Sequence, residues 1–410
     1  MTPPASEGKR AGGTEEPLLP EFSGGSHGGG GASVSGAVFN VSTSIVGAGI
    51  MSIPAAMRVL GVAPALLLIA AVAALADASV EFMLRYTGWA GGKRATSTYA
   101  GLMGDAFGRA GAAVLNVFVA FTTTGTLVVY LIIIGDVMSG SVGGGDDHAG
   151  VLQELFGAQW WTGRQFVLLV AAVFVLLPLV LRRRVDSLRF TSALSILLAV
   201  VFMLIMHPIR AELSKASDMK AAVRISLVLC AAIYAAVGFF GFLLFGDATM
   251  ADVLANFDRS SGAGVPQALN DAARLSYALH LVLVFPLLFF SLRVNVDELL
   301  FPGRRPLAAD TRRFVSLTAV LMAVLYALAI AIPSIWTLFE YSGSTFAVTI
   351  SLIFPGAIVL RDVHGIAKRK DKALAATMII LAVVTSSIAI ASNIMSSISD
   401  KVRRGHEASR

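Results

Sequence analysis

The sequence predicts an all-α integral membrane protein built as a bundle of about ten membrane-spanning helices. Of its 410 residues, 56% are hydrophobic and only 14% are charged, whereas soluble globular chains carry about 25% charged residues. Stretches long enough to cross a bilayer fill most of the chain. None of them shows the period-two alternation of an outer-membrane barrel, so helices are the expected spanning structure.

The candidate spans follow from the dimensions of the bilayer. A hydrocarbon core of about 30 Å requires about 20 apolar residues in a helix. Only the second candidate contains formal charges, Asp77 and Glu81, near one end. The ten candidates are 36–57, 63–84, 111–135, 165–181, 190–206, 225–246, 275–292, 314–333, 341–360 and 374–397.

The two ends of the chain differ from this membrane region. Residues 1–35 are rich in Gly, Ser, Pro and Glu and are predicted to form a disordered cytoplasmic tail. They contain no apolar h-region, so we expect no cleavable signal peptide. Residues 15–19 resemble an acidic dileucine sorting signal, with an ordinary acidic tail as the alternative. Residues 36–397 form the membrane domain, and 398–410 a short polar C-terminal tail.

Composition and motifs exclude several classes of function. The single cysteine, Cys230, cannot form a disulfide within the chain, and the six histidines are scattered rather than placed at zinc-ligand spacing. The chain has no GxSxG, HExxH or P-loop motif, so we expect neither an enzyme nor an ATP-driven pump. The net charge of +6 indicates basic loops facing an anionic leaflet rather than nucleic acid. We predict no metal and no cofactor.

The charges of the loops predict their sides but conflict with the number of spans. Lys and Arg mark cytoplasmic loops, whereas loops 139–163 and 247–271 are poor in both and are expected outside or in a lumen. Two cytoplasmic loops must be joined by an even number of spans, yet only 20 residues, enough for one crossing, separate Arg189 from Arg210. A span is therefore predicted to be missing near Met206 and His207, with a re-entrant segment over 190–209 as the alternative. The basic loops are 85–109, 182–189, 210–224, 293–313 and 361–372.

The first span contains an unusual density of residues that break helices. Gly47, Ala48 and Gly49 are followed by Pro54, which predicts an interrupted helix. In transporters, such interruptions aim backbone N–H groups at an anionic group, while unwound carbonyls hold a cation. The alternative is that the glycines only permit close helix packing.

Three strings resemble the amino acid/auxin permease family, whose members carry the amino acid transporter transmembrane domain. They are GAVFNVSTSIVGAGIMSIP from Gly36 to Pro54, GFFGFLLFGDATMADVLANFD ending at Asp258, and VFPLLFFSLRVNVDELLFP ending at Pro302. The closest resemblance is to the sodium-coupled-neutral-amino-acid-transporter-like branch, which includes plant vacuolar amino acid transporters. It covers residues 33–397 and implies eleven spans in a leucine-transporter-like fold of inverted repeats.

The resemblance also implies site residues. The substrate carboxylate would bind the backbone N–H groups of Ala48 and Gly49, beside Gly47. A sodium ion, if one is used, would contact the carbonyls of Thr43 and Val46 and a hydroxyl group from a later helix, for which Ser291 is the candidate.

A further charged group lies at the end of the second span. Asp77, Glu81 and Arg85 follow one another at intervals of four residues and share a helix face. They are interpreted as a structural ion pair near the interface, with a proton relay as the alternative.

The resulting functional hypothesis is a secondary active transporter of amino acids, neutral ones first, coupled to a proton or sodium gradient. A vacuolar or other endomembrane location is favoured over the plasma membrane. The alternative is a non-transporting amino acid sensor, or an inactive form that lacks the segment at Met206 and His207.

Overall fold

The computed structural model describes residues 42, 45–89, 98–140, 150–181, 219–250, 253–257, 267–304, 307–332, 338, 343 and 345–408. All regular secondary structure within these residues is helical, which confirms the predicted class. The tail 1–35 and the predicted span 190–206 lie outside the described residues, whereas 398–408 continue the last helix.

The helices follow one another with short 3₁₀ and π segments between them. In chain order they are η1 (Ala48–Ser52), α2 (Ile53–Leu60), α3 (Val62–Trp89), α4 (Tyr99–Ser139), α5 (Val151–Phe156), η3 (Trp160–Thr162), α6 (Arg164–Val170), η4 (Ala171–Leu176), α7 (Leu177–Val180), α9 (Met219–Phe245), η6 (Gly246–Ala248), α10 (Val253–Asn256), α11 (Gln267–Leu300), η7 (Leu307–Ala309), α12 (Thr311–Ala331), η9 (Thr349–Ile353), α14 (Phe354–Arg361) and α15 (Arg369–Ala408).

Nine of the ten predicted spans correspond to helices in the described part of the chain. Three of these helices are shorter apolar ones, Ala48–Leu60, Arg164–Val180 and Thr345–Arg361. The other six are long and apolar enough to cross a membrane: Val62–Thr87, Tyr99–Ser139, Val223–Ala248, Ala268–Leu300, Thr311–Ala331 and Arg369–Met395.

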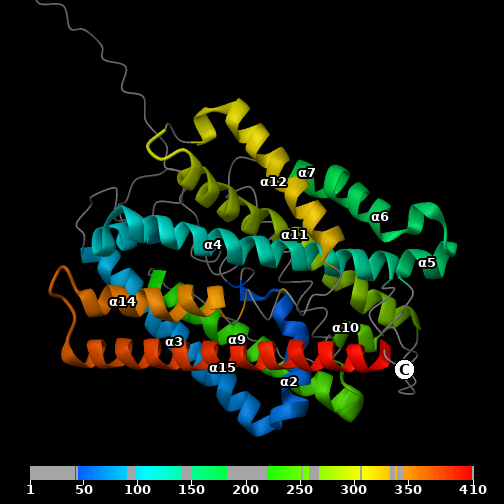
Figure 1. Cartoon of the computed structure of the whole chain (residues 1–410), viewed down its shortest axis with the longest axis horizontal. Coiled ribbons are helices and arrows are strands. Elements are labelled where there is room, and N and C mark those ends of the chain that lie inside the picture. Colours follow the sequence, from blue (N-terminus) through cyan, green and yellow to red (C-terminus); the bar gives the residue numbers. More distant parts are fainter. Residues whose placement is uncertain are drawn as a thin grey trace, which may run out of the picture.

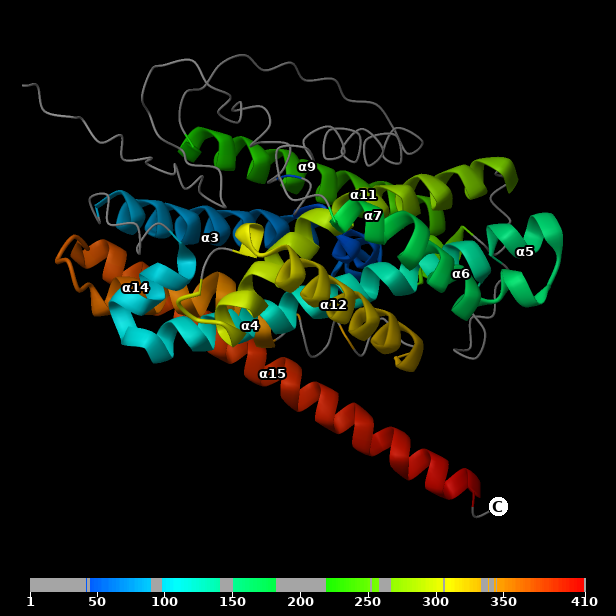
Figure 2. The same ribbon diagram turned by 90° about the horizontal axis from the view of Figure 1, so that it is seen from above.

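The long helices α4 and α11 form the centre of the bundle (Figures 1 and 2). In Figure 1, α6, α7 and α12 lie on one side of this pair, and α3, α9, α14 and α15 lie on the other. The main hydrophobic core joins α4 and α11 to the first span through residues such as Met51, Tyr130 and Phe285. A second core packs α3, α4, α14 and α15 together around Phe82 and Met378.

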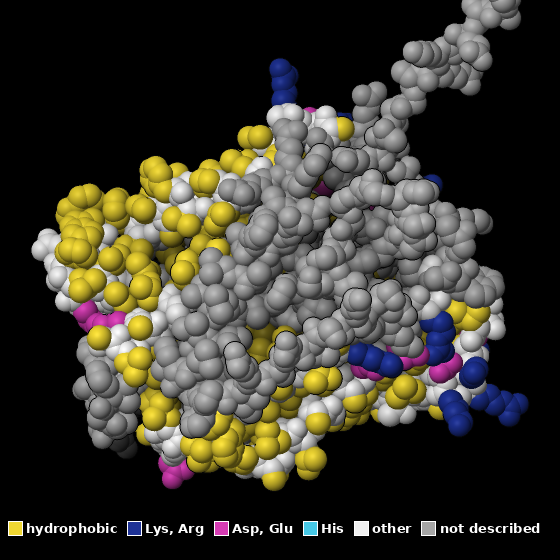
Figure 3. Space-filling view, turned by 180° about the vertical axis from the view of Figure 1, so that it is seen from behind, with side chains coloured by type: hydrophobic (Ala, Val, Ile, Leu, Met, Phe, Trp, Pro, Cys, Tyr) yellow, Lys and Arg dark blue, Asp and Glu magenta, His cyan; other side chains and the backbone are white. Residues whose placement is uncertain are grey.

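Contacts between helix ends gather charged side chains at one end of the bundle. Arg224 pairs with Asp77, and Arg85 pairs with Asp371, so α3, α9 and α15 meet there. His364, which follows α14, contacts Asp105 near the start of α4. Among the described side chains in Figure 3, Lys and Arg lie mainly at one edge, and hydrophobic side chains cover much of the rest.

The buried side chain of Arg293 joins α11 to the end of α7 and to α12. Its Nη1 donates to the carbonyl oxygen of Val180, at the end of α7 (2.9 Å), and to Thr318 Oγ1 on α12 (3.1 Å). Its guanidinium carbon lies 4.0 Å from the ring centre of Phe314. The last part of α11 and the end of α7 are therefore neighbours.

Other ion pairs join the opposite ends of these helices. Asp136, near the end of α4, lies 3.5 Å from Arg164 at the start of α6. Glu154 of α5 lies 3.4 Å from Arg274, in the first part of α11. The sides of the membrane predicted for the loops remain a prediction.

Proline accounts for one distortion of the spans. Pro355 has no N–H group, which leaves the carbonyl of Ser351 without its helical donor. Ser79 Oγ of α3 donates to that oxygen (2.5 Å), and the Tyr99 hydroxyl donates to the preceding carbonyl, that of Ile350 (2.7 Å). The π segment η9 lies directly before Pro355.

Close packing of α9 on α2 depends on glycine and gives a first prediction. A Cβ atom on Gly241 would lie 2.7 Å from Pro54 Cγ, in a ring that cannot rotate away. We expect Gly241→Ala to lower the free energy of unfolding by about 1–3 kcal/mol, the usual cost of overpacking, measured by denaturation in detergent. Gly104→Ala is the control because its Cβ would meet only an ordinary contact, 3.6 Å from Ala112. Equal stability of both variants would contradict the packing argument.

Candidate functional site

The first span is interrupted in the structure at the predicted position. Gly47 has an extended backbone (φ −118°, ψ −166°), and the 3₁₀ helix η1 begins immediately after it. Glycine is a poor helix former, whereas Pro54 is tolerated near the start of α2, where η1 changes into an α-helix. The sequence around Gly47 therefore favours a break followed by a restarted helix.

The carbonyl groups of the break are hydrogen-bonded by side chains from two other helices. From α9, the Tyr234 hydroxyl donates to Ile45 O (2.8 Å) and Cys230 Sγ lies 3.6 Å from Ser42 O. From α11, the Tyr277 hydroxyl donates to Gly47 O (3.1 Å). The oxygens of Ser42, Ile45 and Gly47 also accept backbone N–H groups, those of Val46, Gly47 and Ile50. The side chains therefore add second hydrogen bonds, which tie the break to α9 and α11.

His280 of α11 supplies a donor that sequence reasoning missed. Its Nε2 lies 3.0 Å from the carbonyl oxygen of Val46. A carbonyl can only accept, so Nε2 carries the hydrogen. The imidazole is fully buried and stacks on Tyr277, with ring centres 5.7 Å apart. One sequence signal could have identified His280, which is a histidine inside a span that has no charged residues. Burying an ionisable residue in a membrane costs free energy, so such a residue is often functional.

The N–H groups that follow the break have no acceptor within the first span's restarted helix. Ala48 and Gly49 are the first residues of η1, where backbone N–H groups lack an acceptor within the helix. Ala48 is buried, whereas Gly49 is exposed, and a Cβ atom added to Gly49 would meet no described atom within 4 Å. A Cβ atom on Gly47 would instead lie 2.7 Å from the hydroxyl oxygen of Tyr130.

Tyr130 of α4 is a second site residue that the sequence did not reveal. Its hydroxyl is fully buried and has no hydrogen-bond partner among the described residues. A buried hydroxyl normally has a partner, which makes Tyr130 a candidate site residue beside Gly47.

The residues proposed for a cation are not brought together. The carbonyl of Val46 contacts His280, whereas Ser291 lies eleven residues further along α11, a distance of about 16 Å along a helix axis. Ser291 contacts Asn295 of its own helix instead. Thr43 lies outside the described residues.

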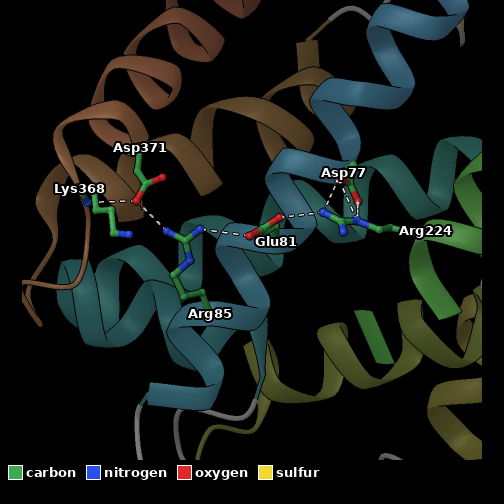
Figure 4. Close-up of polar contacts among 6 residues, drawn as sticks. All are labelled: Asp77, Glu81, Arg85, Arg224, Lys368 and Asp371. Carbon is green, nitrogen blue, oxygen red and sulfur yellow. Dashed lines mark hydrogen bonds and ion pairs between the residues drawn. The ribbon is translucent and has the colours of Figure 1, made fainter. Parts of the chain in front are cut away.

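Asp77, Glu81 and Arg85 belong to a larger group of ion pairs, here called the basic-face network, with Arg224 and Asp371 (Figure 4). Arg224 lies 3.1 Å from both Asp77 and Glu81. Arg85 lies 3.2 Å from Glu81 and 2.7 Å from Asp371. The network joins α3, α9 and α15, and its side chains are partly exposed, which supports the structural interpretation over a proton relay.

These features define a class of protein: a helical membrane protein whose broken first span has backbone N–H groups without an acceptor within its restarted helix. Comparison with known families agrees. Residues 30–214 and 202–399 match the family described as transmembrane amino acid transporter protein. The chain belongs to this family of transporters and is not an enzyme.

Relatives with similar sequences are plant proteins. Amino acid transporter AVT6C of Arabidopsis thaliana is 47% identical, over 89% of this chain and 94% of its own. Amino acid transporter AVT6D of the same plant is 46% identical, over 88% of this chain and 92% of its own. A more distant relative, sodium-coupled neutral amino acid transporter 7 of Danio rerio, is 24% identical over 88% of this chain and 86% of its own.

The comparisons also locate an internal difference. The alignment with AVT6C is 414 positions long and includes 89% of this 410-residue chain, which is about 365 residues. At about 50 positions of the alignment this chain therefore has no residue. The family match is divided into two parts that overlap over residues 202–214. Both findings agree with the sequence-based prediction of a missing span near Met206 and His207.

A double-mutant cycle tests the basic-face network. We expect Arg224→Glu to lower the melting temperature in detergent, because it places a third carboxylate beside Asp77 and Glu81. Adding Asp77→Arg restores an opposite pair and should recover part of the loss. The single variant Asp77→Arg is measured as well. If the loss in melting temperature of the double variant equals the sum of the losses of the two single variants, Asp77 and Arg224 are not coupled.

Proposed function

We propose that this protein is a secondary active transporter of neutral amino acids, driven by a proton or sodium gradient. It works by alternating access around the broken first span. The observation that carries the proposal is the interruption at Gly47, after which the N–H groups of Ala48 and Gly49 lack an acceptor within the helix. Family membership supports the substrate class.

The substrate carboxylate binds at the start of η1. Helix N-termini carry a partial positive charge, and broken transporter helices use it to hold anionic groups. The helix that starts at Ala48 continues to Leu60, long enough for its dipole to contribute. The Tyr130 hydroxyl, buried beside Gly47, supplies a further hydrogen bond to the carboxylate.

The arrangement proposed for the family is a leucine-transporter-like fold of two inverted five-helix repeats, with eleven spans. In this chain one span is absent near Met206 and His207. Two observations support the absence: the family match is divided into two parts, and about 50 positions of the alignment with AVT6C have no residue here, enough for one span and its loops. The proposed location is the vacuole or another endomembrane.

The missing positions favour a second candidate, a form that folds and binds an amino acid or a partner without transporting. In the proposed fold, substrate lies between the broken first and sixth helices, and the sixth helix falls in the missing stretch. The chain retains the first half of this site and lacks most of the second.

Uptake of radiolabelled amino acids by proteoliposomes tests the carboxylate site. We expect Gly49→Trp to abolish concentrative uptake by filling the space beside the start of η1. Size-exclusion chromatography checks that the variant stays monodisperse, as expected where an added Cβ atom meets no described atom within 4 Å. Leu67→Trp, at an exposed position on α3, is the control and should transport normally. Unchanged uptake by Gly49→Trp would refute the placement of the carboxylate.

A chimera separates the two candidates. Inserting the roughly 50 residues of AVT6C that have no counterpart here between Met206 and His207 restores one span and its loops. If the missing span alone prevents transport, the chimera concentrates amino acids and the chain as written only binds them. If the chain as written already concentrates amino acids, the non-transporting form is excluded. Sequencing transcripts across these two codons shows which form the cell makes.

A further inference from the structure

We propose that His280 takes the place of a sodium ion at the broken first span, so that this protein has no sodium site there. This proposal rests on the proposed transport function. It adds to that function by naming a coupling ion, sodium, that does not bind at this site. It makes His280 a positioning residue, which holds the break through the Val46 carbonyl.

The carbonyl oxygens of the break are already engaged. Sodium in broken-helix transporters is held by unwound carbonyls, and here the oxygens of Ser42, Ile45, Val46 and Gly47 each meet a side-chain donor. The hydrogen on Nε2 of His280 is the positive end of a dipole aimed at Val46 O, where a cation would bind. A cation bound at the Val46 oxygen would be repelled by the hydrogen on Nε2, which points at the same oxygen. The imidazole therefore excludes the ion.

The part of α11 next to Val46 offers no replacement oxygen. One turn from His280 on the same helix face lie Tyr277 and Val284. The Tyr277 hydroxyl is bound to Gly47 O, and Val284 is buried hydrocarbon. Ser276 Oγ donates to Ala273 O of its own helix. With Ser291 about 16 Å further along the helix axis, α11 does not bring to Val46 the hydroxyl ligand that the family resemblance implies.

A side-chain donor differs from a bound ion in one respect that matters for coupling. Sodium enters and leaves with each cycle and responds to its own gradient, whereas His280 is part of the chain. The contact between the first span and α11 therefore forms at any sodium concentration. Transport was proposed to be driven by a proton or a sodium gradient. Without a sodium site at the break, the proton gradient is the expected driving force.

The chain contains its own reporter for this contact. Cys230 is the single cysteine, it is buried, and its sulfur touches the carbonyl of Ser42 in the break. The rate at which a maleimide labels Cys230 in the full-length protein, in detergent at one fixed pH and without amino acid, measures how often the break opens. The assay compares sodium chloride with choline chloride, and thermal unfolding is followed in the same buffers.

We expect the unmodified protein to be labelled at the same rate in both salts. His280→Ala removes a buried hydrogen bond worth about 1 kcal/mol, so labelling should be about three- to tenfold faster in choline. Sodium should slow this variant, because the Val46 carbonyl is now open to a cation. His280→Gln, whose amide can still donate to Val46 O, should behave like the unmodified protein.

Two results overturn the proposal. Slower labelling of the unmodified protein in sodium, or a higher melting temperature in sodium than in choline, shows that sodium binds despite His280. Equal behaviour of His280→Ala and His280→Gln shows that the donor does not matter. If both variants aggregate on size exclusion, the sodium titration of the unmodified protein decides alone. None of these measurements requires transport, so a failure of uptake refutes the proposed function and leaves this test intact.

Discussion

The structure depends on the cost of leaving backbone carbonyls unpaired at the centre of an apolar bundle. A continuous helix avoids this cost, but the first span is broken at Gly47. The Val46 carbonyl there meets His280 of α11. The carbonyls of Ile45 and Gly47 accept nearby backbone N–H groups and gain second donors from Tyr234 of α9 and Tyr277 of α11. The break therefore fixes which helices surround it, and the donors that stabilise it also determine what else can bind there.

The same principle operates where α14 begins. Pro355 deprives Ser351 O of its helical donor, and Ser79 replaces it from α3. Both irregular stretches of backbone are thus held by side chains of helices distant in the sequence. At the break in the first span, the carbonyl oxygens are hydrogen-bonded by side chains, whereas the space beside Gly49 holds no described atom within 4 Å of an added Cβ atom. This asymmetry suits an anionic group better than a cation.

The sequence predicted these features unequally. Hydropathy identified the spans, because about 20 apolar residues are a strong signal, whereas the sides assigned to the charged loops stay a prediction. Gly47 and Pro54 indicated the break, since few residues disrupt a helix so reliably. The donors were not predictable, because Tyr234 and His280 lie 189 and 234 residues from their acceptors. Ser291 was predicted as a cation ligand because the family resemblance implies a hydroxyl group from a later helix. Its position on α11 places it far from Val46 along the helix axis. Arg224 was likewise invisible as the partner of Asp77, because pairing between distant helices leaves no local pattern.

Two junctions between helices are held by interactions of different character. The basic-face network consists of partly exposed ion pairs, such as Arg224 with Asp77, which dissolved salt screens over about 8 Å at physiological ionic strength. Arg293 instead binds a carbonyl and an aromatic ring in a buried position, where mobile ions do not reach. Rising ionic strength therefore loosens the junction of α3, α9 and α15 and leaves that of α7, α11 and α12 unchanged. The bundle has one junction whose stiffness follows the salt content of the surrounding compartment and one whose stiffness does not.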